Sequence, residues 1–159
     1  ITLRTTPDLR WARRDIKSTN LLAQVMAKHA AHNAGDYEAL MIDQDGYVTE
    51  AGSSSFFFIK DNELFIRPVT NEILHGITRQ TMLRVAQQMD LKFVERVYKL
   101  DEVLEADEAL ITASSIYVLP VSKIDDHVIA DGQAGRFTIA LRKAYLETAR
   151  AEFYQPTDI

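Results

Sequence analysis

Three short polar segments of the sequence carry the residue types that usually surround a small charged ligand. Residues 50–55 read Glu-Ala-Gly-Ser-Ser-Ser, residues 76–78 read Gly-Ile-Thr, and residues 112–115 read Thr-Ala-Ser-Ser. Each lies where a predicted strand ends or a predicted helix begins, and small-molecule sites gather at such places. Free N–H groups and a hydroxyl at 76–78 suit a phosphate. An ordinary helix start capped by Thr78 explains the same residues, and plain polar loops explain the serine segments.

A second candidate for chemistry is Lys17, which stands between Ile16 and Ser18 just ahead of a predicted apolar helix. A lysine that is partly buried in such a setting can act as a nucleophile or a base. The simpler alternative is a solvated lysine within the basic stretch 10–17. Taken alone, the residue types around Lys17 favour this simpler interpretation.

Other common sites are disfavoured. His29 and His32 lie three residues apart without a third ligand, and His75 and His127 stand alone, so a metal site is not indicated. No glycine-rich dinucleotide motif or P-loop occurs. The serine run 53–55 lacks the Gly-x-Ser-x-Gly spacing of a hydrolase nucleophile.

The composition limits the class of protein. The chain has 159 residues, 47% of them apolar and 26% charged, which suits one globular domain with a sizeable core. Without cysteine it has no disulfides or cysteine-rich metal sites. No apolar run is long enough to cross a bilayer, and a net charge of −5 argues against a nucleic-acid partner. We expect a soluble cytoplasmic protein that acts on small molecules or binds another protein.

The hydrophobic pattern predicts the elements that must position these residues. Strands alternate with three long amphipathic helices, and paired strands around short turns indicate hairpins. On the first helix, Leu22, Val25, Met26 and Ala30 form the expected apolar face, with Gly35 behind its C-terminus. Strands are expected at 1–9, 37–43, 47–49, 56–59, 64–66, 92–97, 109–112, 118–124 and 128–129, and helices at 18–33, 76–90, 100–104 and 135–153. This order predicts a single α/β domain with a mixed, partly barrel-like sheet and helices packed outside.

Four segments together resemble one enzyme family. Residues 10–22, which read Arg-Trp-x-x-Arg-Asp-Ile-Lys-Ser-x-Asn-Leu-Leu, resemble the lysine segment of the fold-type IV pyridoxal-phosphate aminotransferases. Residues 49–54, 73–79 and 111–115 resemble the glutamate, phosphate-cup and later phosphate segments of that family, in the same order. The unbroken run 15–22 is most similar to the D-amino-acid branch. Branched-chain aminotransferases and aminodeoxychorismate lyases share the fold and remain alternatives.

The resemblance implies a role for each site residue. Lys17 would bind pyridoxal 5′-phosphate covalently and move a proton at the substrate α-carbon. Glu50 would face the pyridine nitrogen, Arg10 would bind the phosphate, and Leu74 would pack against the ring. The remaining implied contacts are to the phosphate from Gly76, Ile77, Thr78 and Ser114, and to the substrate from Ser115. Ser55 departs from the family's usual asparagine.

The resemblance also implies an organisation of the chain. Residues 1–9 would be the remnant of an interdomain linker, and 10–159 the cofactor-binding C-terminal domain. The chain begins at Ile1 without methionine, and the family's smaller N-terminal domain is expected to be missing. Partners would then be an amino acid, a 2-oxo acid, the missing domain and a second subunit in a homodimer. Alone, the chain would be an incomplete enzyme or an inactive fragment. Trp11 and the phenylalanine run 56–58 would be exposed where that domain belongs.

Overall fold

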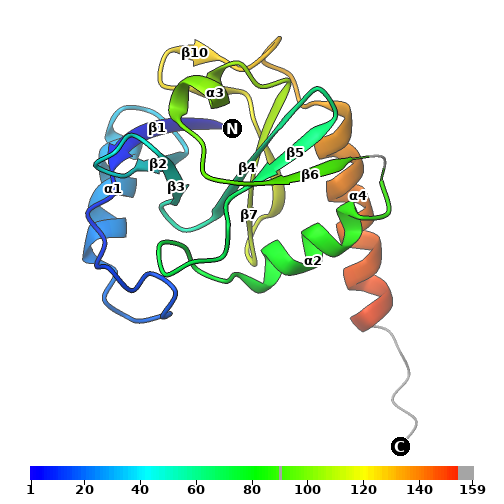
Figure 1. The fold of residues 1–159 in the computed structure, drawn as a ribbon, viewed down its shortest axis with the longest axis horizontal. Helices are drawn as coiled ribbons and strands as arrows, with labels where there is room; N and C mark the ends of the chain where they lie inside the picture. The colour runs from blue at the N-terminus through cyan, green and yellow to red at the C-terminus, as the bar shows by residue number, and fades with distance from the viewer. Residues whose placement is uncertain (90, 154–159) are drawn as a thin grey trace, which may run out of the picture.

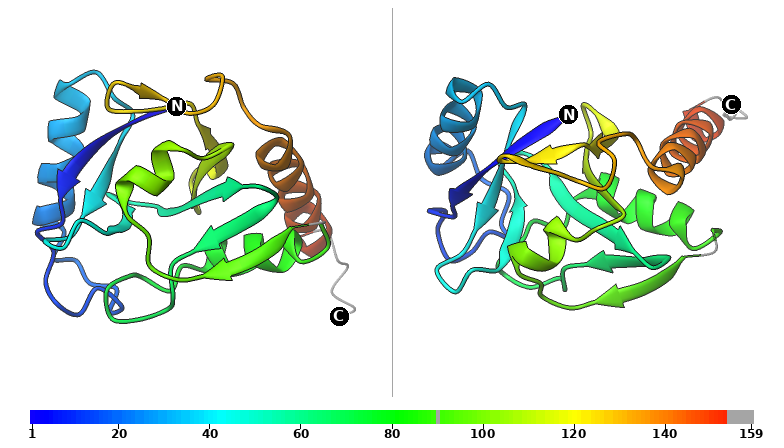
Figure 2. Two further views of the ribbon diagram at one scale, coloured as in Figure 1. Left: turned by 45° about the horizontal axis from the view of Figure 1, so that its top comes forward. Right: turned by 90° about the horizontal axis from the view of Figure 1, so that it is seen from above.

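The computed structural model describes residues 1–89 and 91–153, and its strands form two five-stranded sheets (Figures 1 and 2). The first sheet has the order β10-β9-β1-β2-β3 and the second the order β6-β5-β4-β7-β8. In the first sheet β1 runs parallel to both neighbours, and in the second only β5 and β6 are parallel. The strands of the first sheet are β1 (Thr2–Pro7), β2 (Glu38–Ile42), β3 (Val48–Ala51), β9 (Lys123–Ile124) and β10 (His127–Val128). Those of the second are β4 (Ser55–Lys60), β5 (Glu63–Ile66), β6 (Lys92–Glu95), β7 (Glu108–Ala113) and β8 (Tyr117–Val121).

Four helices lie beside the sheets. Helix α1 (Leu22–Asn33) packs on β1 and β2, whereas α2 (Ile77–Ala86) and α4 (Arg136–Phe153) pack on each other and on the second sheet. The short α3 (Leu100–Leu104) adds Val103 to the core. The expected single α/β domain with a mixed, partly barrel-like sheet and outer helices is confirmed, with its strands divided between two sheets. The predicted end of the second helix at residue 90 lies outside the described residues.

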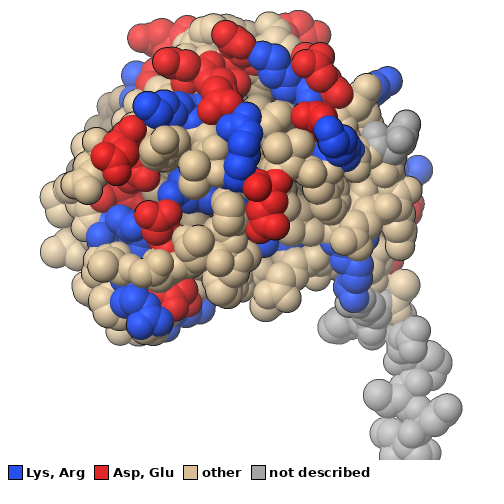
Figure 3. All heavy atoms as spheres, viewed as in Figure 1, with Lys and Arg blue, Asp and Glu red and all other residues tan. Residues whose placement is uncertain are grey.

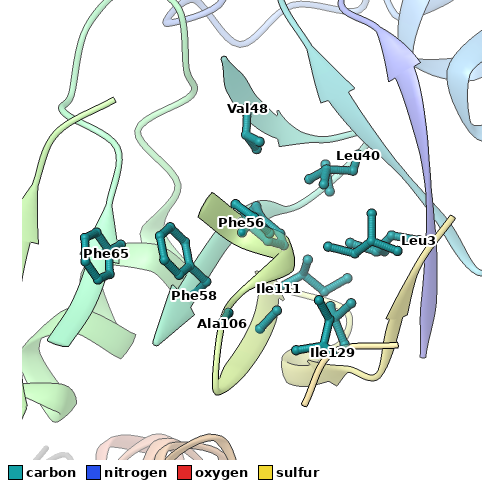
Figure 4. Packing of buried hydrophobic residues seen from close by; sticks show 14 of the residues in the cluster. Leu3, Leu40, Val48, Phe56, Phe58, Phe65, Ala106, Ile111 and Ile129 are labelled. Atoms are coloured by element: carbon teal, nitrogen blue, oxygen red, sulfur yellow. The ribbon is translucent and has the colours of Figure 1, made fainter. Parts of the chain in front are cut away.

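The main core lies between the two sheets, as Figure 4 shows. Leu3 and Leu40 of the first sheet meet Phe56, Phe58 and Ile111 of the second. Because successive side chains of a strand point to opposite faces, Phe57 belongs to a second cluster under α2 and α4. The expectation of an exposed phenylalanine run is therefore wrong: Phe56, Phe57 and Phe58 are at most 3% exposed. Both faces of β4 are covered, one by the other sheet and one by helices.

Residues 1–9 contribute a strand to the middle of the first sheet. β1 pairs with β2 on one side and β9 on the other, and Leu3 is fully buried. A parallel strand covered on both edges is an integral part of a domain. The predicted origin of this segment as the end of a linker stays a prediction.

Helix α1 buries a different face from the predicted one. It begins at Leu22 rather than at residue 18, and Leu22, Val25 and Met26 are all more than half exposed. Its buried residues are Ala27 and Ala31, which cluster with Ala39 and Met41 of β2. Small side chains let the helix approach the sheet closely, so the larger apolar residues are left at the surface.

The chain crosses between the sheets at two places. One is the loop 52–54 between β3 and β4, and the other is residue 122 between β8 and β9. The predicted single strand 118–124 is thus two strands in different sheets. The polar loop with Gly52 consequently lies where the two sheets meet, next to the ends of several elements.

The surface carries charges of both signs. On the face in Figure 3, basic and acidic side chains are interspersed, and acidic ones gather along the upper edge. Among the described residues no helix is both long and apolar enough to cross a membrane.

The buried carboxylate of Glu108 fixes the start of α4. It accepts hydrogen bonds from the N–H groups of Phe137 and Thr138 at 2.9 and 2.7 Å, and from the Thr138 hydroxyl at 2.7 Å. Gly135 leaves room for this carboxylate, because a Cβ there would lie 2.0 Å from Glu108 Cδ. A side chain from β7 thus caps a helix almost thirty residues further along.

We predict that Glu108→Ala lowers the free energy of unfolding by about 2 kcal/mol, since it leaves two N–H groups and a buried hydroxyl without their acceptor. Urea unfolding followed by circular dichroism measures this loss. Glu105→Ala is the matched control, because that carboxylate is 73% exposed and bonds only Lys60 at the surface, so its loss costs less than about 1 kcal/mol. Equal stability of the two variants would contradict the cap.

Candidate functional site

A cavity of about 660 Å³ opens where the two sheets meet. The segment before α1, the crossing loop, the start of α2 and the end of β7 all contribute to its wall. The expected convergence of Lys17, Glu50 and the 76–78 corner is therefore confirmed. The wall includes Arg10, Lys17, Glu50, Leu74, Gly76, Ile77, Thr78 and Ser114. Ser115 does not line the cavity; it is exposed beside Ser114 in the turn between β7 and β8.

Lys17 lies on the irregular segment ahead of α1, with an exposed side chain. Among the described residues it makes no hydrogen bond or ion pair, so its amine is open to a ligand in the cavity. A second lysine of the wall differs: Lys28 Nζ donates to Ser53 Oγ at 2.7 Å and lies 3.2 Å from Glu38 Oε2. Of these two amines, only that of Lys17 is available without breaking an existing contact.

The crossing loop is held from behind by the Glu38 carboxylate, which is buried. Ser53 Oγ donates to Glu38 Oε2 at 2.7 Å, and Lys28 reaches both groups from α1. A Cβ at Gly52 would lie 2.7 Å from Glu38 Oε1 and from Lys28 Cγ, so a larger residue there would displace these two side chains. The loop is thereby fixed on its outer side, and its inner side forms part of the cavity wall.

Glu50 is buried on β3 and turns its carboxylate to the cavity. Its Oε2 accepts hydrogen bonds from Arg10 Nη1 at 2.6 Å and from the Leu74 N–H at 3.1 Å. Burial raises the pKa of Glu50 above its ordinary value, although the charge and hydrogen bond of Arg10 oppose this. Within the described part of the chain no hydrogen bond reaches Oε1. This oxygen can accept an N–H group from a ligand.

The guanidinium of Arg10 is occupied by carboxylates. Nε and Nη2 donate to the two oxygens of Asp8 at 2.9 and 2.8 Å, while Nη1 bonds Glu50. The predicted phosphate contact of Arg10 is not tested and stays a prediction. The sequence patterns did not indicate Asp8 as part of the site. Its only signal in the sequence is its position two residues before Arg10.

The start of α2 forms the part of the wall best suited to an anion. Gly76 is the N-cap, and no side chain caps the helix, so the alternative of Thr78 as an ordinary cap does not hold. Thr78 is buried within the first turn. Two other buried hydroxyls of the wall, Ser54 Oγ and Thr112 Oγ1, have no hydrogen-bond partner in the part of the chain that the structure describes. Buried hydroxyls are rarely left unsatisfied, so these two groups indicate a polar ligand that completes them.

The turn that carries Ser114 and Ser115 is held by α4. Tyr117 has a φ of 62°, in the left-handed region that side chains other than glycine and asparagine rarely adopt. Its ring packs on Tyr145 with centroids 5.7 Å apart, and Arg142 Nη1 donates to the carbonyl oxygens of Ile116 and Val118. These contacts from one helix stabilise the strained turn at the edge of the cavity.

Several of the exposed residues in the cavity wall are large and apolar. Trp11, Ile16, Leu21 and Val25 line it and are 45–57% exposed, and Ile77 is 75% exposed. The expected exposure of Trp11 is confirmed. Large apolar side chains gathered at one opening are unusual on a free surface and are typical of an interface.

We predict that Thr78→Val weakens binding of inorganic phosphate and of pyridoxal phosphate about tenfold, because a hydrogen bond to a charged group is lost. Isothermal titration calorimetry measures both affinities. Thr148→Val on α4, outside the cavity wall, is the matched control and should leave them unchanged. Unaltered binding by the Thr78 variant would show that this hydroxyl does not contact the phosphate.

Comparison with known proteins identifies the family. The family model for amino-transferase class IV matches residues 1–124. The chain therefore belongs to the class IV aminotransferases, as the four sequence segments predicted. D-alanine aminotransferase of Bacillus licheniformis is 40% identical over 148 residues, which are 93% of this chain and 52% of that protein. D-alanine aminotransferase of Staphylococcus epidermidis is 40% identical over 89% of this chain and 50% of the relative.

Solved structures agree on the fold. A branched-chain amino acid aminotransferase from T.th., in complex with N-(5′-phosphopyridoxyl)-L-glutamate, is 30% identical, with a TM-score of 0.87 over 98% of this chain and 53% of that one. The same enzyme was solved with pyridoxamine 5′-phosphate, at a TM-score of 0.85 and 31% identity over 96% of this chain and 53% of that one. The branched-chain enzyme of Thermobaculum terrenum is 27% identical with a TM-score of 0.85, covering 94% of this chain and 51% of that one. The chain spans about half the length of the relatives it matches.

Proposed function

We propose that the protein is a pyridoxal-phosphate-dependent aminotransferase that moves an amino group between an amino acid, of D configuration, and a 2-oxo acid. The observation that carries this proposal is one cavity bearing a free lysine amine, a buried glutamate with an open oxygen and an uncapped helix start, beside which the hydroxyls of Ser54 and Thr112 have no partner among the described residues. These groups fit an aldehyde, a ring nitrogen and a phosphate, respectively. Pyridoxal phosphate, when bound, supplies the electron sink for a carbanion at the substrate α-carbon.

Each residue of the chain then has a defined task. The Lys17 amine would hold the cofactor at its aldehyde and, as a free amine, would take the proton from the substrate α-carbon. Glu50 Oε1 accepts the ring N–H, and its negative charge favours the protonated ring. The first turn of α2, with the hydroxyls of Thr78 and Ser114, binds the phosphate. Leu74 packs against the ring. Ser115 lies outside the cavity wall, beside Ser114, so its predicted contact with the substrate has no support in the geometry of the cavity.

Arg10 is better suited to support Glu50 than to bind the phosphate itself. To reach a phosphate, its guanidinium would have to give up a contact to Asp8 or Glu50, both of which are buried beside it. Breaking such a pair leaves an uncompensated buried charge, which is costly. We therefore assign Arg10 to the ring-nitrogen side of the site.

The D configuration is favoured by the 40% identity to D-alanine aminotransferases, against 27–31% to the branched-chain enzymes named above. A branched-chain L-amino acid is the second candidate, because solved enzymes of that class share the fold so closely. Assays with D-alanine and with L-leucine, each with 2-oxoglutarate, separate the two. Release of pyruvate without an acceptor would instead indicate a lyase of the same fold.

The whole protein is proposed to include a preceding domain and to act as a cytoplasmic homodimer. Two observations support a further domain or subunit that covers the cavity opening. The chain spans about half of the length of its relatives, and exposed apolar side chains lie in the cavity wall. Closure of the site would exclude water and strengthen its electrostatic contacts.

The test compares the isolated 159-residue chain with the protein that includes its preceding segment. Each is titrated with pyridoxal phosphate and then assayed with D-alanine and 2-oxoglutarate. We expect weak binding and negligible turnover for the isolated chain, and tight binding with turnover for the longer protein. Full activity of a monomeric 159-residue chain would show that the substrate site has been misplaced, and an inactive longer protein would refute the proposed activity.

A further inference from the structure

Asp8 is the most completely enclosed acidic side chain near the site, although it does not line the cavity. Its carboxylate is 0% exposed, and its backbone N–H donates to the Ile42 carbonyl at 2.7 Å. The carboxylate accepts two parallel hydrogen bonds from the Arg10 guanidinium, a third from the Arg10 backbone N–H at 3.1 Å and a fourth from Thr49 Oγ1 at 2.6 Å, and it lies 3.4 Å from Arg14 Nε. Five contacts therefore fix one carboxylate just after the end of β1, next to Arg10 of the cavity wall.

This arrangement determines which hydrogen bonds Arg10 can donate to Glu50. A guanidinium is a planar fork that prefers to bind one carboxylate through two parallel hydrogen bonds. Here Asp8 takes that paired contact through Nε and Nη2, and Nη2 also donates to Thr49 Oγ1 at 3.4 Å. Nη1 is therefore the nitrogen that bonds Glu50, and it bonds Oε2 alone. Without Asp8 the same fork could turn onto Glu50 and occupy both of its oxygens.

We propose that Asp8 is a positioning residue that holds the Arg10 guanidinium on a single oxygen of Glu50 and so keeps Glu50 Oε1 free for a ligand's ring N–H. This inference rests on the proposed function, which supplies such a ligand. It assigns a role in the site to a residue that directly follows β1 and does not line the cavity.

The charged groups around Glu50 also link its pKa to Asp8. Burial raises the pKa of Glu50 and the negative charge of Asp8 adds to this, while Arg10 and the Leu74 N–H oppose it. Burial alone would also raise the pKa of Asp8, but its hydrogen bonds and ion pairs with Arg10 outweigh this, and the pKa is lowered. Arg79 and Tyr98 are the other titratable groups that interact with Glu50. Removal of the Asp8 charge should therefore lower the pKa of Glu50, both directly and by releasing Arg10.

The experiment is a pH titration of the Glu50 carboxyl by ¹³C NMR in the cofactor-free protein, with the resonance assigned through Glu50→Gln. For Asp8→Asn we expect the midpoint to move down by roughly one pH unit. Asp36→Asn is the matched control, because Asp36 is also buried and bonds an arginine, Arg4 at 2.7 Å, away from the cavity; its midpoint should stay in place. A folded Asp8→Asn protein with an unchanged midpoint would overturn the inference.

Two further measurements guard against ambiguity. If Asp8→Asn does not fold, Thr49→Val removes one hydrogen bond to Asp8 and keeps every charge. A smaller shift of the Glu50 midpoint in the same direction supports the inference, and an unchanged midpoint refutes it.

In the longer protein, ¹⁵N NMR of ring-labelled pyridoxal phosphate should show a less protonated ring nitrogen in Asp8→Asn. If the unaltered protein binds no pyridoxal phosphate, the proposed function fails, whereas the Glu50 titration still decides the role of Asp8.

Discussion

Lys17→Ala should abolish covalent attachment of pyridoxal phosphate and lower transamination by about a thousandfold or more in the longer protein, which includes the segment before residue 1. Both losses are expected because one amine serves as covalent anchor and as the group that moves the α-proton, and general acid–base catalysis alone contributes about 10²–10⁴-fold. Absorption spectra before and after borohydride reduction report the attachment, and a coupled assay reports turnover.

Lys28→Ala is the matched control for this substitution. Lys28 lies in the same cavity wall, but its amine is bonded to Ser53 and close to Glu38. We expect the Lys28 variant to retain the borohydride-sensitive band. If the band survives in Lys17→Ala and disappears in Lys28→Ala, the covalent role belongs to the other lysine.

Glu50→Ala should keep the cofactor bound but slow proton transfer about a hundredfold. The phosphate contacts and the covalent bond remain, whereas the negative charge that favours a protonated ring nitrogen is lost. Stopped-flow measurement with α-deuterated D-alanine isolates this step, because its isotope effect should increase as proton transfer becomes rate-limiting. Equal turnover of the variant and the unaltered protein would remove the role given to Glu50.

Much of the fold could be predicted from local patterns. Gly35, Gly46 and Gly132 lie at positive φ in turns, and α4 begins and ends within a residue or so of its expected bounds. What the patterns could not indicate is how strands are shared between sheets. The stretch 118–124 reads as one strand, yet residue 122 carries the chain from the second sheet to the first. β8 pairs with the nearby β7, whereas β9 pairs with β1 at the opposite end of the described chain, and local sequence does not indicate that distant partner.

The two errors about burial have the same physical origin. Leu22, Val25 and Met26 form an apolar face by spacing alone, but close packing on β2 selects Ala27 and Ala31 instead. Sequence periodicity indicates that a helix has an apolar face, and not whether this domain or another polypeptide covers it. The phenylalanine run 56–58 was expected to be exposed and is buried, because both faces of its strand are covered.

The cavity wall was largely predictable because its residues lie in short motifs, whereas the residues behind it were not. Lys17, Glu50 and Thr78 have residue types that suggest chemistry where they stand. Asp8 acts through Arg10, whose partner Glu50 is brought to it across 40 residues, and Glu38 acts through Ser53, 15 residues away. Nothing in the local sequence distinguishes such a carboxylate from a solvated one.

The central claim is that the Lys17 amine is the group that binds pyridoxal phosphate. It is tested most directly by borohydride reduction of the longer protein after it has bound pyridoxal phosphate, followed by proteolysis and mass spectrometry. We predict one modified peptide, carrying the cofactor on Lys17, together with loss of the visible absorption band. Modification of a different lysine, or of many lysines with none preferred, would contradict the account.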